Sequence, residues 1–259
     1  MNKIMLFCLA GIFLLPNFLW VDIHEHPPFD RFESFNDSLS TLQTVDDLTA
    51  YTDSLAAAQH INPHSIHYVS VIEKVLKSRF YHGFSHFTLN ENWLAAVSGK
   101  LFEEGLACKV NPADIVHQSN AACSQQSLVM MAILRKKGFP YRHVGFPHHY
   151  ALEVLHNNEW YFFDPDMEPT LQMEERRLSN WKHQSDALKP FYDTLRFKDL
   201  DFKFGIQQMA TTGTINEIPA QHAHLFQTVT HYVSRMAWCI PLLLAFYRTR
   251  RQFPFLTKK

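Results

Sequence analysis

Two runs of strand-forming residues on either side of a pair of asparagines constrain this chain more than any other feature. The runs "HHYALEVLH" (148–156) and "EWYFFD" (159–164) alternate in polarity and carry many β-branched and aromatic side chains. Asn157 and Asn158 between them tolerate the left-handed backbone of a two-residue hairpin turn. A similar run, "YRHVGF" (141–146), precedes them. The sequence therefore predicts an antiparallel sheet over 141–164.

A helix is expected directly before this sheet. Residues 124–137 place apolar side chains on one side, end in three basic residues and are stopped by Gly138 and Pro140. Helices followed by antiparallel strands indicate an α+β fold. Further helices are expected over 37–59 (one or two), from Asn62 to near Gly83, over 90–102, over 111–116, over the polar stretch 173–193, and from Pro219 onward.

Composition excludes several function classes. The 259 residues carry a net charge of −1 with no cluster of basic residues, so nucleic acid is not an expected partner. Eight glycines form no phosphate-binding loop. Of the sixteen histidines, pairs such as His24/His26 and His222/His224 lack cysteine or carboxylate companions at metal-site spacing, and we expect no metal and no cofactor.

The first 22 residues form an export signal. Lys3 precedes an apolar run from Ile4 to Val21, which is close to the minimum length of a membrane-spanning helix. Pro16 interrupts the run and no small-x-small cleavage site follows, so residues 1–22 are expected to be a signal anchor rather than a removed signal peptide. The basic end should stay in the cytoplasm.

Residues 229–259 are expected to form a hydrophobic C-terminal helix with a basic tail. The apolar core, Met236 to Tyr247, spans a bilayer only if residues 229–235 join it. The alternative is a buried or surface-lying helix. Cell-membrane localisation is predicted, with the domain at 35–225 on the periplasmic or extracellular side. The basic flank consists of Arg248, Arg250, Arg251, Lys258 and Lys259.

Cys123 is the candidate nucleophile. Cys8 and Cys239 lie in the apolar ends, whereas Cys108 and Cys123 lie in the polar middle. Cys123 falls at the N-terminus of the predicted helix, where unpaired backbone N–H groups and the helix dipole favour a thiolate. A Cys108–Cys123 disulfide, or a merely buried cysteine, is the alternative.

The hairpin turn brings a histidine and a carboxylate together. If Asn157 and Asn158 are its central residues, Ala151 faces Asp164, and His149 is a diagonal neighbour of Asp164 at about 7–8 Å between backbones. A carboxylate that holds one imidazole nitrogen leaves the other for a thiol. A slip of one residue would put the two side chains on opposite faces.

Residues 66–169 resemble the transglutaminase-like superfamily, whose core is similar to that of papain-type cysteine proteases. The shared pattern is a helix opened by Cys123, a Gly-x-Pro in "GFPYRHVGF", His149 with Glu153 four residues on in "HYALEV", and "WYFFDP" with Asp164. The resemblance implies a helix carrying the cysteine packed on an antiparallel sheet that carries the histidine and aspartate. It also implies that Cys123 is the nucleophile, His149 the general base and acid, and Asp164 the orienting group.

The expected function is that of an exported thiol enzyme, an acyltransferase or an amidase/protease. It would cleave or transfer an acyl group at an amide bond, through a Cys123 thioester, on an envelope peptide, protein or amino-bearing glycan. The alternative is a non-catalytic, membrane-anchored binding module of the same fold.

Several polar residues near the triad have alternative assignments. His148 is the other candidate base, but the four-residue step to Glu153 favours His149. The backbone N–H of Cys123 and the side chain of Gln118 are candidate oxyanion donors. Gln125 and Gln126 could line the cleft, although they are expected to be ordinary first-turn helix residues.

Overall fold

The structure, a computed structural model, describes residues 3–25, 28–30, 33–167, 169–194 and 196–252. The chain forms two compact units. The terminal unit contains Met1–Glu25, His86–Cys108 and Gln221–Lys259, and the central unit contains His26–Ser85 and Lys109–Ala220. Residues 86–108, which lie inside the predicted domain 35–225, thus pack with the chain ends.

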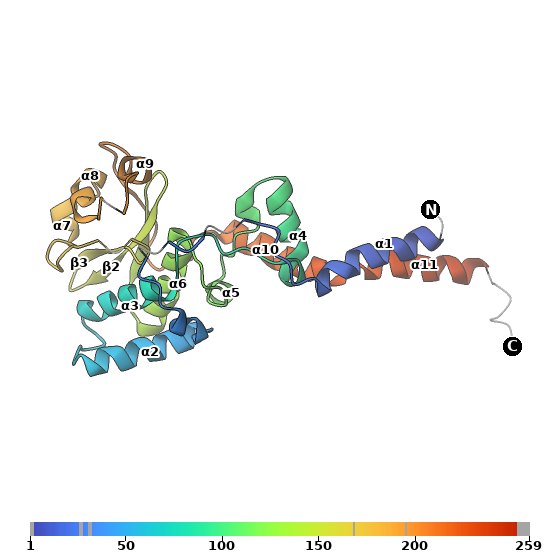
Figure 1. Ribbon diagram of the computed structural model, residues 1–259, viewed down its shortest axis with the longest axis horizontal. Coiled ribbons are helices and arrows are strands. Elements are labelled where there is room, and N and C mark those ends of the chain that lie inside the picture. Colours follow the sequence, from blue (N-terminus) through green and yellow to red (C-terminus); the bar gives the residue numbers. More distant parts are fainter. Residues whose placement is uncertain (1–2, 26–27, 31–32, 168, 195, 253–259) are drawn as a thin grey trace. The chain divides into compact units, whose positions relative to one another are not determined.

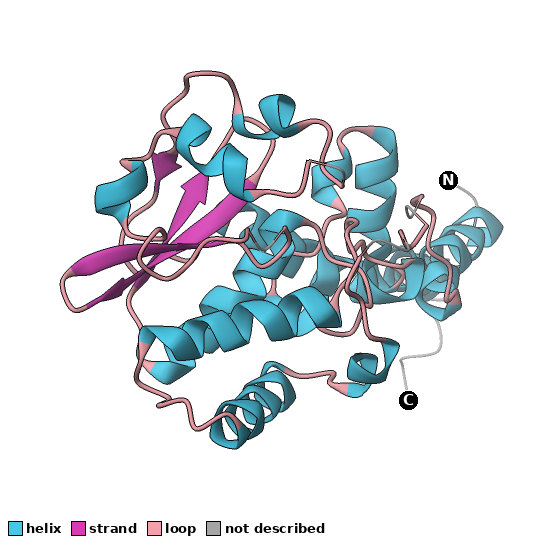
Figure 2. Ribbon diagram, turned by 60° about the vertical axis from the view of Figure 1, so that its left-hand side comes forward, coloured by secondary structure: helices cyan, strands magenta, loops and turns pink. Residues whose placement is uncertain are grey.

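The central unit is α+β and contains a four-stranded antiparallel sheet in the order β3-β2-β1-β4 (Figure 2). The first three strands fall within the predicted runs: β1 is Tyr141–Gly145, β2 is Tyr150–His156 and β3 is Glu159–Phe163. The two-residue strand β4, Thr211–Thr212, was not predicted. It extends the sheet beside β1.

The β2–β3 hairpin has the predicted register. His156 pairs with Glu159, and Leu152 pairs with Phe163. Asn157 and Asn158 have φ angles of 50° and 61°, the left-handed backbone that asparagine tolerates and that a tight turn between twisted strands requires. The turn therefore fixes which side chains of β2 and β3 share a face.

Helices cover one face of this sheet. Apolar residues of α3 (Ile66–Arg79) and α6 (Cys123–Lys137) form one core cluster with Leu152 and Val154 of the sheet. As predicted, α6 stops at Gly138, whose φ of 76° is readily adopted by glycine. The helix predicted to run from Asn62 to near Gly83 begins only at Ile66 and ends at Arg79. The remaining elements here are η2 (Asp37–Thr41), α2 (Val45–Ala58) and α5 (Pro112–Ile115).

Short helices cover the opposite face. The stretch 173–193, predicted to be helical, is helical only in short pieces, because Lys182 and His183 adopt left-handed backbone angles (φ 49° and 60°) that interrupt it. Trp181 packs against Phe162 of β3 with ring centroids 5.2 Å apart. The elements on this side are α7 (Leu178–Trp181), α8 (Ser185–Leu188), η4 (Lys189–Phe191) and α9 (Leu200–Phe204).

The terminal unit is helical (Figure 1). Helix α10 is joined to α4 through Asn92, whose side chain donates to Thr230 at 2.9 Å, and through the Trp93 indole, which donates to the Ser234 carbonyl at 3.1 Å. Helix α1 lies beside α11, with the rings of Phe7 and Phe246 in edge contact. Its elements are α1 (Lys3–Leu14), η1 (Leu15–Phe18), α4 (Leu89–Leu101), η3 (Glu104–Leu106), α10 (Gln221–Met236) and α11 (Cys239–Gln252).

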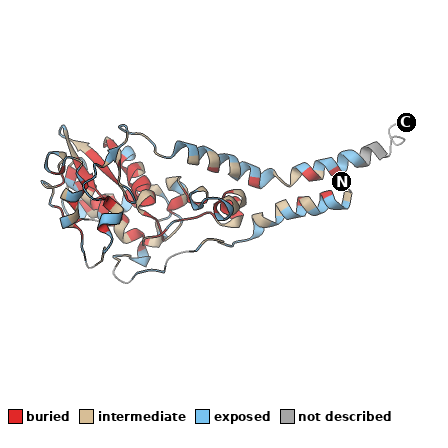
Figure 3. Cartoon of the chain, turned by 90° about the horizontal axis from the view of Figure 1, so that it is seen from above, coloured by how far each residue is buried: buried red, intermediate tan, exposed pale blue. Residues whose placement is uncertain are grey.

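Many residues of the terminal helices are exposed (Figure 3), and on α1, α10 and α11 they include large apolar ones. By length and composition, Gln221–Arg248 is the one helical stretch among the described residues that could cross a membrane, and the N-terminal Lys3–Phe18 is apolar but shorter. Lys258 and Lys259 of the predicted basic tail lie outside the described residues. Exposed apolar side chains of the terminal segments include those of Ile4, Ile12, Phe18, Trp20, Leu225, Tyr232, Ile240 and Leu243.

Replacing Asn158 tests how strongly the turn specifies the hairpin. Asn158→Val forces a β-branched residue into the left-handed region and should lower the free energy of unfolding by about 1–2 kcal/mol. Asn158→Gly, the matched control, should leave it unchanged or raise it. Urea unfolding followed by circular dichroism measures both, and equal stability of the two variants would contradict the left-handed turn.

Candidate active site

Cys123 is the first residue of α6 and is half-buried. The preceding residue, Ala122, offers no side-chain cap to the helix. Backbone N–H groups of an uncapped first turn and the positive end of the helix dipole attract a negative charge. Cys123 therefore opens α6, at the helix position that the sequence predicts.

His149 and Asp164 form a buried hydrogen-bonded pair. The Nε2 atom of His149 lies 2.7 Å from Oδ2 of Asp164, and both side chains are almost fully buried. His149 comes just before β2, and Asp164 directly follows β3. The hairpin register thus brings them together as predicted, although they are 15 positions apart in the chain. The His149 ring also packs against Phe146 and Phe204.

Asp164 is held from several sides. Its Oδ2 accepts from the Tyr192 hydroxyl at 2.8 Å, and its Oδ1 accepts from the backbone N–H groups of Asp166 and Met167 at 3.2 and 3.1 Å. Burial and the neighbouring Asp164 charge raise the pKa of Tyr192 well above its usual range, so that Tyr192 remains a neutral donor. These bonds fix the carboxylate that orients His149.

A buried ion pair supports the backbone of Asp164. Glu73 of α3 accepts the Asp164 backbone N–H at 2.8 Å, and the Arg176 guanidinium lies 2.9 Å from Glu73. Arg176 also donates to the carbonyl of Phe162 in β3 at 3.0 Å. Helix α3 and the end of β3 are therefore joined at the residue that holds His149.

The second nitrogen of His149 faces the thiol side of the site. A ring nitrogen of His149, Sγ of Cys123 and a carboxylate oxygen of Asp166 all lie within 4.8 Å of one another. Because Nε2 is bonded to Asp164, Nδ1 is the nitrogen left for Cys123, and Nδ1 is buried without another hydrogen bond among the described residues. Burial acts to lower the pKa of His149, but Asp164 and the nearby Cys123 outweigh it and raise that pKa well above its usual range.

The other predicted polar residues have different positions. His148 is exposed and stacks on Phe202, away from Asp164. Gln118 uses its backbone carbonyl to accept from Arg79 at 2.9 Å, and no described contact joins its side chain to Cys123. Gln118 as an oxyanion donor stays a prediction.

Gln125 is a structural residue of the first turn of α6. Its amide nitrogen donates to the carbonyls of Ser85 and Lys109 at 2.9 and 2.8 Å, and its oxygen accepts from the backbone N–H of Ser85 at 2.8 Å. The side chain therefore ties two distant segments to the start of the helix rather than lining a cleft.

Sequence reasoning missed a second histidine–aspartate pair beside the thiol. Nδ1 of His82 lies 2.9 and 3.1 Å from the two carboxylate oxygens of Asp166. Gln126, on the first turn of α6, donates to the same carboxylate at 2.9 Å. The only sequence signal was the second aspartate of "DPD", because His82 is 84 positions away from Asp166.

Two clusters have donor types found in metal sites. One cluster, in the terminal unit, consists of His24, His86 and Glu104, whose wide spacing in the sequence gives no sign that they lie close together. The two imidazoles stack with an interplanar angle of 22°, so their in-plane lone pairs do not converge on one ion. In the central unit, the carboxylate of Asp166 near Cys123 and His149 is already used by His82 and Gln126. The Asp166 carboxylate of the second cluster therefore already has two side-chain hydrogen-bond partners.

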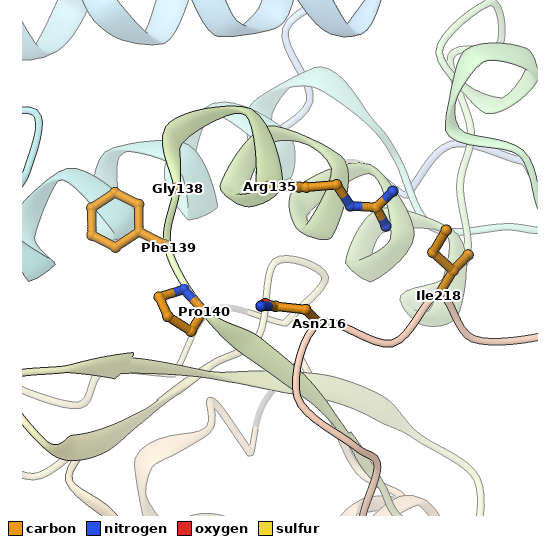
Figure 4. A pocket seen from close by; sticks show the side chains of 6 residues that line it. All are labelled: Arg135, Gly138, Phe139, Pro140, Asn216 and Ile218. Carbon is orange, nitrogen blue, oxygen red and sulfur yellow. The ribbon is translucent and has the colours of Figure 1, made fainter.

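The pocket drawn in Figure 4 lies at the other end of α6. It is lined by Arg135, Gly138, Phe139, Pro140, Asn216 and Ile218. Arg135 follows Cys123 by twelve residues, which is about 18 Å along a helix. This pocket is therefore separate from the candidate active site.

All four cysteines are free thiols, which argues against the alternative Cys108–Cys123 disulfide. Cys108 is buried, and its thiol donates to the Glu104 carbonyl at 3.4 Å. Burial raises the pKa of Cys108 to about 12. Cys108 is thus an inert structural thiol.

Comparisons with protein-family models, with curated proteins and with solved structures found no match to this chain. The interpretation of the site therefore depends on its own geometry.

Proposed function

We propose that the protein is a cysteine-dependent acyltransferase or amidase with a transglutaminase-like core, in which Cys123, His149 and Asp164 form the catalytic triad. The observation that carries this proposal is the buried His149–Asp164 bond of 2.7 Å, which leaves Nδ1 of His149 beside the half-buried thiol at the start of α6. An imidazole held by a carboxylate on one side and facing a thiol on the other is the arrangement that activates a cysteine nucleophile.

The reaction follows from these roles. The Cys123 thiolate attacks the carbonyl carbon of the substrate, and the C–N bond of the amide breaks as protonated His149 gives its proton to the leaving nitrogen. Water or an amine then attacks the thioester, His149 takes the proton of the attacking group, and the thiolate leaves. The backbone N–H of Cys123 is the proposed donor to the oxyanion. Asp164 keeps the imidazole in the tautomer and orientation that both steps need.

The proposed substrate is an amide-bearing peptide, protein or amino-bearing glycan of the cell envelope. Its location follows from the terminal unit, whose helices expose apolar side chains and include the candidate span Gln221–Arg248. We propose that these helices anchor the protein in the cell membrane, with the central unit on the exported side.

A non-catalytic binding module of the same fold is the second candidate function. In that case the buried polar network would serve only to shape a binding surface. The reactivity of the Cys123 thiol toward electrophiles distinguishes the two candidate functions.

An activated ester tests the acyl chemistry. p-Nitrophenyl acetate should give a burst of nitrophenolate with an acetyl group on Cys123, found by peptide mass spectrometry. His149→Ala should slow acylation by roughly 10²- to 10⁴-fold, because the imidazole that takes the proton of the Cys123 thiol is lost. Cys123→Ser should show no burst, and His148→Ala is the matched control. Equal bursts in wild type and His149→Ala would exclude the imidazole from the mechanism, and a chelator should change none of these rates.

Cys108 and Cys123 should differ in reactivity. At pH 8 iodoacetamide should alkylate Cys123 much faster than Cys108, because a thiol with a pKa of about 12 is almost entirely protonated there. Peptide mapping after timed quenching gives both rates in one sample. Similar rates for the two thiols would favour the binding module.

The proposed orientation can be tested in membrane vesicles from expressing cells. Protease should digest the central unit in right-side-out vesicles and leave it intact in inverted ones, because the basic flanks stay in the cytoplasm. Immunoblotting with an antibody against residues 45–58 reads the result. Digestion in inverted vesicles alone would reverse the orientation.

A further inference from the structure

A negatively charged side chain lies where it should hinder the thiolate. A carboxylate oxygen of Asp166 is within 4.8 Å of Cys123 Sγ and of His149, and Asp166 is buried. A like charge at this distance disfavours ionisation of the thiol. The proposed function requires a thiolate at Cys123, so the charge of Asp166 needs compensation.

His82 provides a positive charge at this carboxylate. Its Nδ1 donates to both oxygens of Asp166, at 2.9 and 3.1 Å, from a side chain that is 42% exposed. The segment that carries His82 is tied to the site, since the Tyr81 backbone N–H and carbonyl bond Ser119 and Ala121 just before α6. The pair is therefore held beside the nucleophile.

The groups around His82 determine how firmly it keeps its proton. Asp166 and the thiolate of Cys123 attract the imidazolium, Lys203 of α9 repels it, and Asp166 dominates, raising the pKa of His82 to about 9. Glu33 accepts the His82 backbone N–H at 2.8 Å, and burial raises the pKa of Glu33. Burial acts to raise the pKa of Asp166, but His82 outweighs it and lowers that pKa. At neutral pH the pair is imidazolium and carboxylate.

We propose that His82 and Asp166 form a positioning pair in which the imidazolium of His82 cancels the charge of Asp166 and so allows Cys123 to carry a thiolate. This inference rests on the proposed function for its purpose, although it concerns the charge at Cys123 and not the acyl reaction. Asp166 is retained in this pair because it also accepts from Gln126 at 2.9 Å and so anchors the first turn of α6. The site then has two histidine–aspartate pairs: a buried one that moves protons and a half-exposed one that sets charge.

A double-mutant cycle that removes each charge in turn tests the pair. The rate of Cys123 alkylation by iodoacetamide is measured from pH 5 to 10 in wild type, His82→Asn, Asp166→Asn and the double variant. His82→Asn should move the midpoint to higher pH by about one unit, which is about a tenfold loss of rate at pH values well below both midpoints, because the carboxylate is uncompensated. Asp166→Asn should not move it upward, and the double variant should return close to wild type.

His148→Asn is the matched control, since that ring stacks on Phe202 outside the pair, and it should leave the midpoint unchanged. A merely structural role for His82 would reduce folded protein or rates at every pH without moving the midpoint, and that result would overturn the proposal. An unchanged midpoint of the alkylation profile in His82→Asn, together with normal acylation by wild type, would contradict this inference alone. An unreactive Cys123 thiol and no acylation in wild type would contradict the proposed function instead.

A measurement on wild type covers the case in which His82→Asn does not fold. The His82 imidazole should titrate with a midpoint near pH 9 by NMR of histidine-labelled protein, and lower in Asp166→Asn. In wild type, a midpoint near that of a free histidine would show that His82 is largely neutral at neutral pH, and it would overturn the proposal.

Discussion

The register of the β2–β3 hairpin is the constraint on which the rest of the site depends. Asn157 and Asn158 close the turn with left-handed backbone angles, and Phe163, the last residue of β3, pairs with Leu152 of β2. His149 then meets Asp164 at 2.7 Å. Because strand side chains alternate between faces, a shift of one residue would separate them entirely.

Buried charges hold each strand of the hairpin to a neighbouring element. On one side, Glu73 and Arg176 clamp the end of β3. On the other, Glu153 of β2 is fully buried and bonds Arg142 across the ladder at 2.7 Å. Buried ion pairs contribute little net stability, since desolvation offsets their attraction, but removing one partner is costly. Such pairs therefore specify one arrangement of strands rather than strengthen the fold.

The sequence predicted the parts of the site that depend on local signals. Asn157 and Asn158, the strand alternation and the stop at Gly138 are all readable over a few residues, and they place His149 and Asp164. The residues that support them were not predictable, because Glu73 and His82 lie 91 and 84 positions from their partners. Long-range contacts of this kind leave no periodic pattern. The helix predicted over 173–193 failed because its polar residues concealed the turn at Lys182 and His183.

The free energy needed to bury the ionisable groups of His149 and Asp164 favours an enzyme over a binding module. His149 and Asp164 are buried beneath the rings of Phe146, Phe204 and Tyr192, where an apolar pair would pack without desolvating ionisable groups. A binding surface needs groups that reach a partner, and these do not. Buried ionisable groups gathered at one thiol are instead typical of sites that transfer protons. Under the proposed function, a substrate would meet this cluster at the half-buried Cys123 and the partly exposed His82.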